Sequence, residues 1–445
     1  MNAERAFAFD RAANLYSLAN RLAIESGASM PQLLPRLAEA YAGAVDTSRA
    51  KLEVMEDNRA EIDRLLDRQA VLYDEVRADY DSIRTRHAAK NQERPLVSLE
   101  DARANRTPVD WSGYRPPVPR ALQVQAKDVW SHRPGERAGD VRPHFVRTFG
   151  DYALEELRRY IDWQPFFNAW EMKGRFPDIL NNPSTGEAAR KLWEDAQAML
   201  DRVIEERWLR AKGVVGLFPA NAVGDDVEVY ADESRTEVLT TLCNLRQQGQ
   251  HREGVPNRSL GDYVAPRETG LRDYVGAFAV TAGLGSAAKI AEFKERLDDY
   301  SAILLESLAD RLAEAFAERL HERVRREFWG YASDESLDND ALIKERYQGI
   351  RPAPGYPACP DHTEKAVLWD LLDVEASTAI ELTESMAMWP GAAVSGWYFS
   401  HPQSQYFVVG RISRDQVEDY ARRKGWTLAE AQRWLSPNLG YEPED

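Results

Sequence analysis

One proline-rich stretch, Arg351 to Thr363, limits what the C-terminal part of this chain can fold into. It reads Arg-Pro-Ala-Pro-Gly-Tyr-Pro-Ala-Cys-Pro-Asp-His-Thr. The prolines exclude a helix and a hydrogen-bonded strand, because proline lacks an N–H and fixes φ. We therefore expect a stiff, irregular loop that carries Arg351, Tyr356 and His362. A loop with a cation and an aromatic ring suits a small zwitterionic ligand, although a connector between helices is the plainer interpretation.

The overall charge argues against two classes of partner. The 445 residues include 73 acidic and 57 basic side chains, for a net charge of −16. This excess of acid disfavours a general nucleic-acid binder and an anionic-membrane binder. Only Cys243 and Cys359 occur, which excludes a disulfide framework and a multi-cysteine zinc site. With neither a bilayer-length apolar run nor a signal peptide, we expect a cytoplasmic protein without nucleic-acid or membrane partners.

Before the main domain, two regions differ in composition. Residues 1–89 carry apolar side chains at helical spacing among many charges, which predicts a helical arm whose function is unknown. Residues 90–148 contain an extended, proline-rich strap, followed from Ala126 to Thr148 by a polar, turn-rich insertion. Nothing in either region forms a recognisable cofactor motif.

Residues 149–445 alternate between helical and strand patterns. Helices are expected over 149–163, 188–211, 287–328 (with a break near Asp298), 414–423 and 427–435, the last two capped by Ser413 and Thr427. Strands are expected over 214–218, 227–230, 236–242 and 274–281, and as a hairpin of 394–400 with 406–412. The expected class is α+β, with a mainly antiparallel sheet flanked by helices. Since no Gly-x-Gly-x-x-Gly fingerprint occurs, a Rossmann domain is not expected.

The helix expected around residues 301–328 carries a polar constellation. Asp310, Glu314 and His321 fall on nearly one face at 3.6 residues per turn. Together they could form a metal site, an acid–base pair or a cation-binding wall, or simply a solvated face. The adjacent stripe is expected to be core, and it consists of Leu305, Leu308, Leu312, Phe316 and Leu320.

Three further features have a structural and a functional interpretation. Asp162 is typical of a capping or turn residue. Tyr406 and Phe407 are typical of sheet core. The small residues between Glu384 and Tyr398 are compatible with tight packing, and equally with the close approach of a flat ring.

Five short sequence segments are more informative together than each is alone. They are Tyr160 to Trp163, Lys212 to Asn221, Asp310 to Phe316, Gly349 to Lys365 and Glu384 to His401. In this order they resemble the S-adenosylmethionine-binding activation domain of cobalamin-dependent methionine synthase. The resemblance runs from about Asn91 to Asp445. It implies a methyltransferase role in methionine biosynthesis, with S-adenosylmethionine as the methyl donor and cobalamin held by a partner module or subunit.

The resemblance also assigns roles to particular residues. It implies that S-adenosylmethionine is bound by Asp162, Glu314, Arg351, Tyr356, Tyr406 and Phe407, with Phe407 standing where the family has a second tyrosine. It implies a surface facing cobalamin that comprises Asp310, Trp389, Gly391, Ala392 and Ser395. Catalytic residues are not assigned with certainty, and no metal ligand is expected.

The function implied is reductive methylation of cob(II)alamin to methylcobalamin, with an electron from a flavodoxin-like donor. The chain lacks an Asp-x-His-x-x-Gly motif, zinc cysteines and the length for the substrate barrels. We therefore do not expect this chain alone to carry out complete methionine synthase turnover. We expect a split or stand-alone reactivation subunit instead. A non-catalytic, S-adenosylmethionine-responsive partner of a corrinoid protein and a degenerate remnant are the alternatives.

Overall fold

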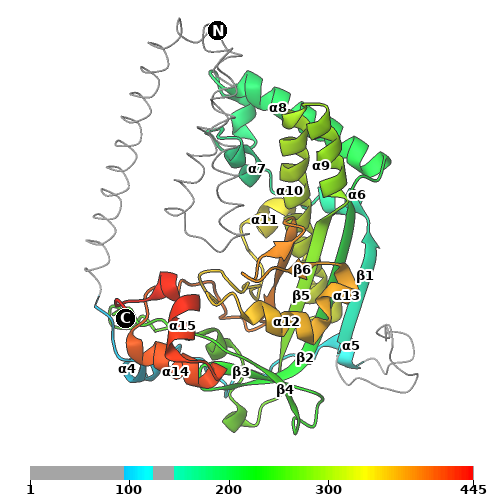
Figure 1. Ribbon diagram of the computed structural model, residues 1–445. Helices are drawn as coiled ribbons and strands as arrows, with labels where there is room; N and C mark the ends of the chain where they lie inside the picture. Colours follow the sequence, from blue (N-terminus) through cyan, green and yellow to red (C-terminus); the bar gives the residue numbers. More distant parts are fainter. Residues whose placement is uncertain (1–94, 124–144, 444–445) are drawn as a thin grey trace, which may run out of the picture. The chain divides into compact units, whose positions relative to one another are not determined.

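The structure is a computed structural model that describes residues 95–123 and 145–443. These residues belong to one compact unit of the chain (Figure 1). The helical arm expected over 1–89 lies outside the described residues, and so does most of the insertion expected at 126–148.

A six-stranded antiparallel sheet organises this unit. Its order is β4-β3-β2-β5-β8, and β1 also pairs with β2. Because β5 occupies one edge of β2 throughout, β1 and β3 share the other edge, one after the other. The strands are β1 (Phe145–Tyr152), β2 (Arg210–Val223), β3 (Asp226–Tyr230), β4 (Val238–Leu242), β5 (Asp273–Leu284) and β8 (Ala393–Tyr398). A separate two-stranded sheet pairs β6 (Glu381–Leu382) with β7 (Met388–Trp389).

Both faces of the sheet are buried, so the central strands are almost wholly apolar. Alternate residues of β2 and β5 enter two different cores, as the two-residue period of a strand requires. Val215 and Phe278 enter the first core, whereas Val214 and Ala277 enter the second. The expected α+β class with a mainly antiparallel sheet is confirmed.

The first core lies under helices that precede and follow β5 in the chain. Its central helix is α10 (Asp299–Arg323), which begins where Asp298 accepts a hydrogen bond from the Ser301 N–H at 3.0 Å. All five residues of the expected core stripe are fully buried on α10. The neighbouring helices are α6 (Leu154–Arg158), α7 (Gln164–Ala169), α8 (Gly186–Glu205) and α9 (Ser286–Glu295). A π-helical turn, Val324–Phe328, extends α10, and α11 (Asn339–Ile343) follows it.

The second core is covered by the helices that follow the proline-rich stretch. They are α12 (Glu364–Leu372), α13 (Val374–Thr378), α14 (Arg414–Lys424) and α15 (Leu428–Trp434). The Thr427 side chain accepts from the Glu430 N–H at 3.2 Å, so it caps α15 as expected. Ser413 stands at the N-terminus of α14, but its hydroxyl makes no capping bond and instead donates to Asp415.

Residues 95–123 form a strap along this unit. The strap includes α4 (Leu99–Ala104) and α5 (Arg120–Gln123). Near its start, the Leu99 N–H donates to Asp415 at 2.6 Å. Near its end, Trp329 donates from its indole nitrogen to the Pro117 carbonyl at 2.8 Å. The strap therefore joins α14 to the end of the α10 region.

Two sequence predictions of secondary structure are wrong. Residues 149–163 are not one helix, because β1 extends to Tyr152 and pairs with the free edge of β2 before α6 begins. Residues 406–412 do not form the second arm of a hairpin with β8. The Val409 N–H donates to the Pro357 carbonyl at 2.8 Å, so this segment pairs with the proline-rich stretch instead.

Candidate functional site

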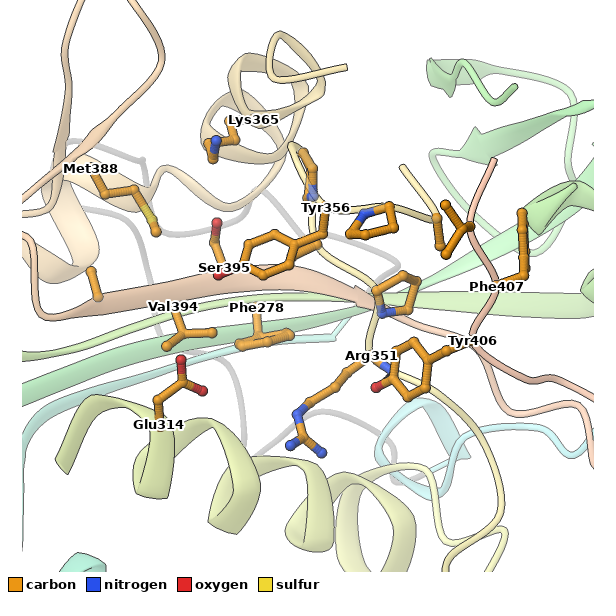
Figure 2. A pocket seen from close by; sticks show the side chains of 17 residues that line it. Phe278, Glu314, Arg351, Tyr356, Lys365, Met388, Val394, Ser395, Tyr406 and Phe407 are labelled. Atoms are coloured by element: carbon orange, nitrogen blue, oxygen red, sulfur yellow. Dashed lines mark hydrogen bonds between the residues drawn. The ribbon is translucent and has the colours of Figure 1, made fainter. Parts of the chain in front are cut away.

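A cavity of about 400 Å³ lies beside β8, between α10 and α12 (Figure 2). Three short segments supply most of its wall: the proline-rich stretch, the start of β8, and residues 406–408. Single residues from β5, α10, α12 and β7 complete it. The lining residues are Phe278, Glu314, Arg351, Pro352, Ala353, Pro354, Tyr356, Pro357, Ala358, Lys365, Met388, Ala393, Val394, Ser395, Tyr406, Phe407 and Val408.

The proline-rich stretch is held against β8 by backbone contacts. The Trp397 N–H donates to the Pro352 carbonyl at 2.9 Å, which uses part of the outer edge of β8. Gly396 makes this approach possible, since a Cβ there would lie 2.7 Å from the Pro352 oxygen. The stretch then turns at Gly355, whose φ of +91° favours glycine. The proline-rich stretch, which cannot form a regular strand, is therefore fixed as a rigid wall of the cavity.

Arg351 lies at the end of this wall nearest α10, and three neighbouring side chains hold its guanidinium group. Nη2 donates to Glu318 at 2.7 Å, and Nη1 donates to the Tyr347 hydroxyl at 2.5 Å. Nη1 also lies 3.2 Å from Nδ1 of His321. Because guanidinium has only donors, this imidazole nitrogen accepts. No bond from Nε is found among the described residues, which leaves Nε–H and one Nη2 hydrogen for a ligand.

His321 does not join Asp310 and Glu314 on an open face of α10. It is fully buried, with its ring stacked 5.0 Å from that of Tyr398. Burial lowers the pKa of His321 well below its ordinary value, and the charges of Arg325 and Arg351 lower it further. The neutral imidazole therefore supports Arg351. The described residues contain no cluster of three or more His, Cys, Asp or Glu that could hold a metal.

Aromatic rings and a carboxylate border the rest of the cavity. Tyr356 is 63% exposed, and burial and the Glu314 carboxylate both raise the pKa of its hydroxyl. Tyr406 accepts a hydrogen bond from the Arg351 N–H at 3.0 Å, which leaves its own O–H free to donate. Phe407 is buried beside it. Of the residues predicted to bind one ligand, five thus line the same cavity: Glu314, Arg351, Tyr356, Tyr406 and Phe407.

The sixth residue of that set, Asp162, is not among the lining residues. Its carboxylate accepts from the Gln164 N–H at 2.9 Å, between α6 and α7. This contact agrees with the turn interpretation and leaves the other carboxylate oxygen available.

The second predicted set lies mostly at the rim. Met388 of β7 and Ala393 of β8 line the cavity, and residues 390–392 form the loop between the two strands. Trp389, the last residue of β7, is 58% exposed. On the loop, Gly391 is exposed, whereas Ala392 is buried. Asp310 is exposed on α10, where partial burial raises its pKa, and it does not line the cavity. Ser395 is the member of this set that lines it.

Comparison with known proteins gives this cavity a context. Residues 153–425 match the family model described as vitamin B12 dependent methionine synthase, activation domain. The chain belongs to this family. Its fold is also similar to a solved structure described as the crystal structure of the MetH reactivation domain bound to AdoHcy. The two share 53% sequence identity, with a TM-score of 0.71 over 78% of this chain and 100% of that chain.

Two groups of residues around the cavity of this activation domain escaped the sequence-based assignment. Glu318, His321 and Tyr347 hold Arg351 from 33, 30 and 4 positions away, and separations of this kind along the chain give no motif. Lys365 lies at the start of α12, three residues after His362, and this helical spacing was the available signal. No described helix is long and apolar enough to cross a membrane.

Proposed function

We propose that the cavity beside β8 binds S-adenosylmethionine and presents its methyl group to cobalamin held by a separate module or subunit. The carrying observation is that five residues assigned to this ligand, from distant parts of the sequence, line one cavity. AdoHcy, bound in the similar structure, is what S-adenosylmethionine becomes on losing its methyl group. The reaction supported is reductive methylation of cob(II)alamin to methylcobalamin, which needs one electron from a flavodoxin-like donor. We further propose a split or stand-alone reactivation subunit.

The two free donors of Arg351 suit the ligand's carboxylate, because Nε–H and Nη2–H point along one edge of the guanidinium plane. Glu314 is exposed and faces the cavity, where it would meet the ammonium or sulfonium charge at low desolvation cost. Tyr356 and Phe407 would pack against the adenosine part, and Tyr406 would donate its free hydroxyl proton. Asp162 would contribute its unused carboxylate oxygen.

Cobalamin supplies the methyl acceptor, and the protein's contribution is to orient the donor. The segment from Trp389 to Ala392, together with Asp310 and Ser395, would face the corrin ring. Its exposed indole and its Cβ-free surface at Gly391 offer a flat contact beside the cavity. Holding the sulfonium methyl in line with its acceptor is a proximity effect, so no covalent protein intermediate is required.

Calorimetric titration with AdoHcy tests the site. We expect the wild-type chain to bind, and both Arg351→Ala and Glu314→Gln to bind at least about tenfold more weakly, or about 1.4 kcal/mol. Glu314 is exposed, so its variant should keep the wild-type unfolding temperature. Arg296→Ala, on the exposed end of α9, is the matched control and should bind normally. Unchanged affinity in both site variants would contradict the proposed site.

A further inference from the structure

A buried cation, Lys365, lies at the far end of the same cavity, and the proposed function gives it no role. Lys365 is 5% exposed and lines the cavity from the first turn of α12. Figure 2 shows it on the opposite side of β8 from Glu314. Across the described residues, no carboxylate lies within salt-bridge distance of its ammonium group. Arg351, by contrast, is neutralised by Glu318 at 2.7 Å.

The position of Lys365 is fixed by the proline-rich stretch. Its Nζ lies 2.9 Å from Nδ1 of His362, and the ammonium is the donor because it has no lone pair. The His362 ring is itself held under Gly355, where a Cβ would lie 2.4 Å from the imidazole. Burial lowers the pKa of Lys365 by more than the Asp361 carboxylate, which lies beyond salt-bridge distance, raises it. Two of its three N–H groups remain for a ligand.

A buried hydroxyl group without a hydrogen-bond partner lies on the same side of β8 as Lys365. Ser395 is 2% exposed, lines the cavity, and has no hydrogen-bond partner for its Oγ. In Figure 2 its hydroxyl projects from β8 toward the side on which Lys365 and Met388 lie. A buried hydroxyl without a partner costs about 1–3 kcal/mol, so such groups call for an explanation in function or packing.

We propose that Lys365 and Ser395 form a second polar subsite, which binds acceptor oxygens of the molecules brought together at this cavity. Such oxygens are the ribose hydroxyls of S-adenosylmethionine and the amide carbonyls around a corrin ring. The subsite rests on the proposed function, and it gives the cavity polar groups at both ends with an apolar middle. Lys365 then steers a neutral or negative oxygen, while Glu314 meets the positive end of the methyl donor.

The test uses the full chain with Lys365→Met and Ser395→Ala, which remove the polar group while keeping most of the volume. The matched controls are Lys191→Met, at an exposed position, and Ser307→Ala, at a half-buried position of α10 outside the cavity. One arm measures AdoHcy affinity by calorimetry. The other measures, at saturating S-adenosylmethionine, the concentration of cobalamin-loaded partner that gives half-maximal methylation.

We expect each site variant to weaken one of these two quantities at least fivefold, with the unfolding temperature unchanged or raised. Loss of AdoHcy affinity would assign the subsite to the nucleoside, and a higher partner requirement would assign it to the corrin. Both quantities within twofold of wild type would overturn the subsite alone, and so would a lowered unfolding temperature with normal binding. A folded wild-type chain that binds no AdoHcy would overturn the proposed function, and the subsite with it.

Discussion

At the residue scale, Arg351 shows how a guanidinium group in a cavity wall is positioned by other residues, two of which lie about 30 positions away in the sequence. Glu318 and Tyr347 engage one side of its guanidinium group, and His321 accepts from it as a neutral base. Since a guanidinium group is planar and rigid, fixing one side also fixes the direction of the free side. The buried polar cluster thus orients the donors that face the cavity.

This arrangement predicts a pH dependence of stability. The pKa of His321 is lowered in the folded state, so the unfolded chain binds its proton more readily below the ordinary value of 6.5. Wild type should therefore lose stability relative to His321→Gln as pH falls from about 7 to about 5, with a slope approaching about 1.4 kcal/mol per pH unit. Urea unfolding of both proteins across this pH range measures the difference between their free energies of unfolding. A difference that stays constant across this range would show that His321 is not held neutral.

The sequence assigned Arg351 and Glu314 to one predicted site because both stand in phrases with a recognisable order, and both line the cavity. It was not sufficient for Glu318 or His321. A helical wheel places His321 beside Glu314, but Tyr398 and Tyr347 cover that part of α10. Burial by a distant segment is a tertiary property, and helical spacing alone does not reveal it.

At the element scale, the cavity exists because β8 is an edge strand and the irregular, proline-rich stretch covers its outer edge. The proline-rich stretch takes one hydrogen bond from β8 and receives another from residue 409, so both neighbours of the cavity are fixed. The long apolar runs of β2 and β5 were predictable, since both faces of those strands are buried. The irregular segment 406–412 was mistaken for a strand because its apolar and polar residues alternate as they do in a strand. Only the segment with which it pairs distinguishes it from a strand of the sheet.

Gly396 tests this packing. Gly396→Ala places a methyl group 2.7 Å from the Pro352 carbonyl oxygen and should destabilise the protein by about 1–3 kcal/mol. AdoHcy affinity should fall as well, since the wall moves. Gly391→Ala meets no atom within 4 Å and should unfold like wild type. Equal unfolding temperatures for the two variants would mean that the proline-rich stretch moves away from β8 without a cost in stability, which would contradict this prediction.

At the scale of the whole described unit, a buried charge network joins the strap, the sheet and the C-terminal helices. Arg246 is 1% exposed and bonds Asp225 and Asp262, each at 2.7 Å. Arg103 of the strap bonds the same Asp225 at 2.7 Å and also Asp419 of α14 at 2.8 Å. Segments that span most of the described sequence thus meet around three carboxylates.

The two arginines should differ sharply in their importance. Arg246→Met leaves two buried carboxylates without a full partner and should cost about 4 kcal/mol. Arg103→Met should cost less than about 1 kcal/mol, because its side chain is 40% exposed and solvent screens the pair. Denaturant unfolding compares them directly. Similar losses for both would refute the view that burial decides the contribution of each pair.

Methyl transfer between chains tests the proposed function most directly. The full chain is mixed with a methionine synthase module that holds cob(II)alamin but lacks an activation domain, together with a reductant and S-adenosylmethionine labelled in its methyl group. The proposed function predicts labelled methylcobalamin and an equal amount of AdoHcy, both reduced strongly by Arg351→Ala. AdoHcy binding without any labelled methylcobalamin would contradict methyl transfer and leave a non-catalytic binding partner.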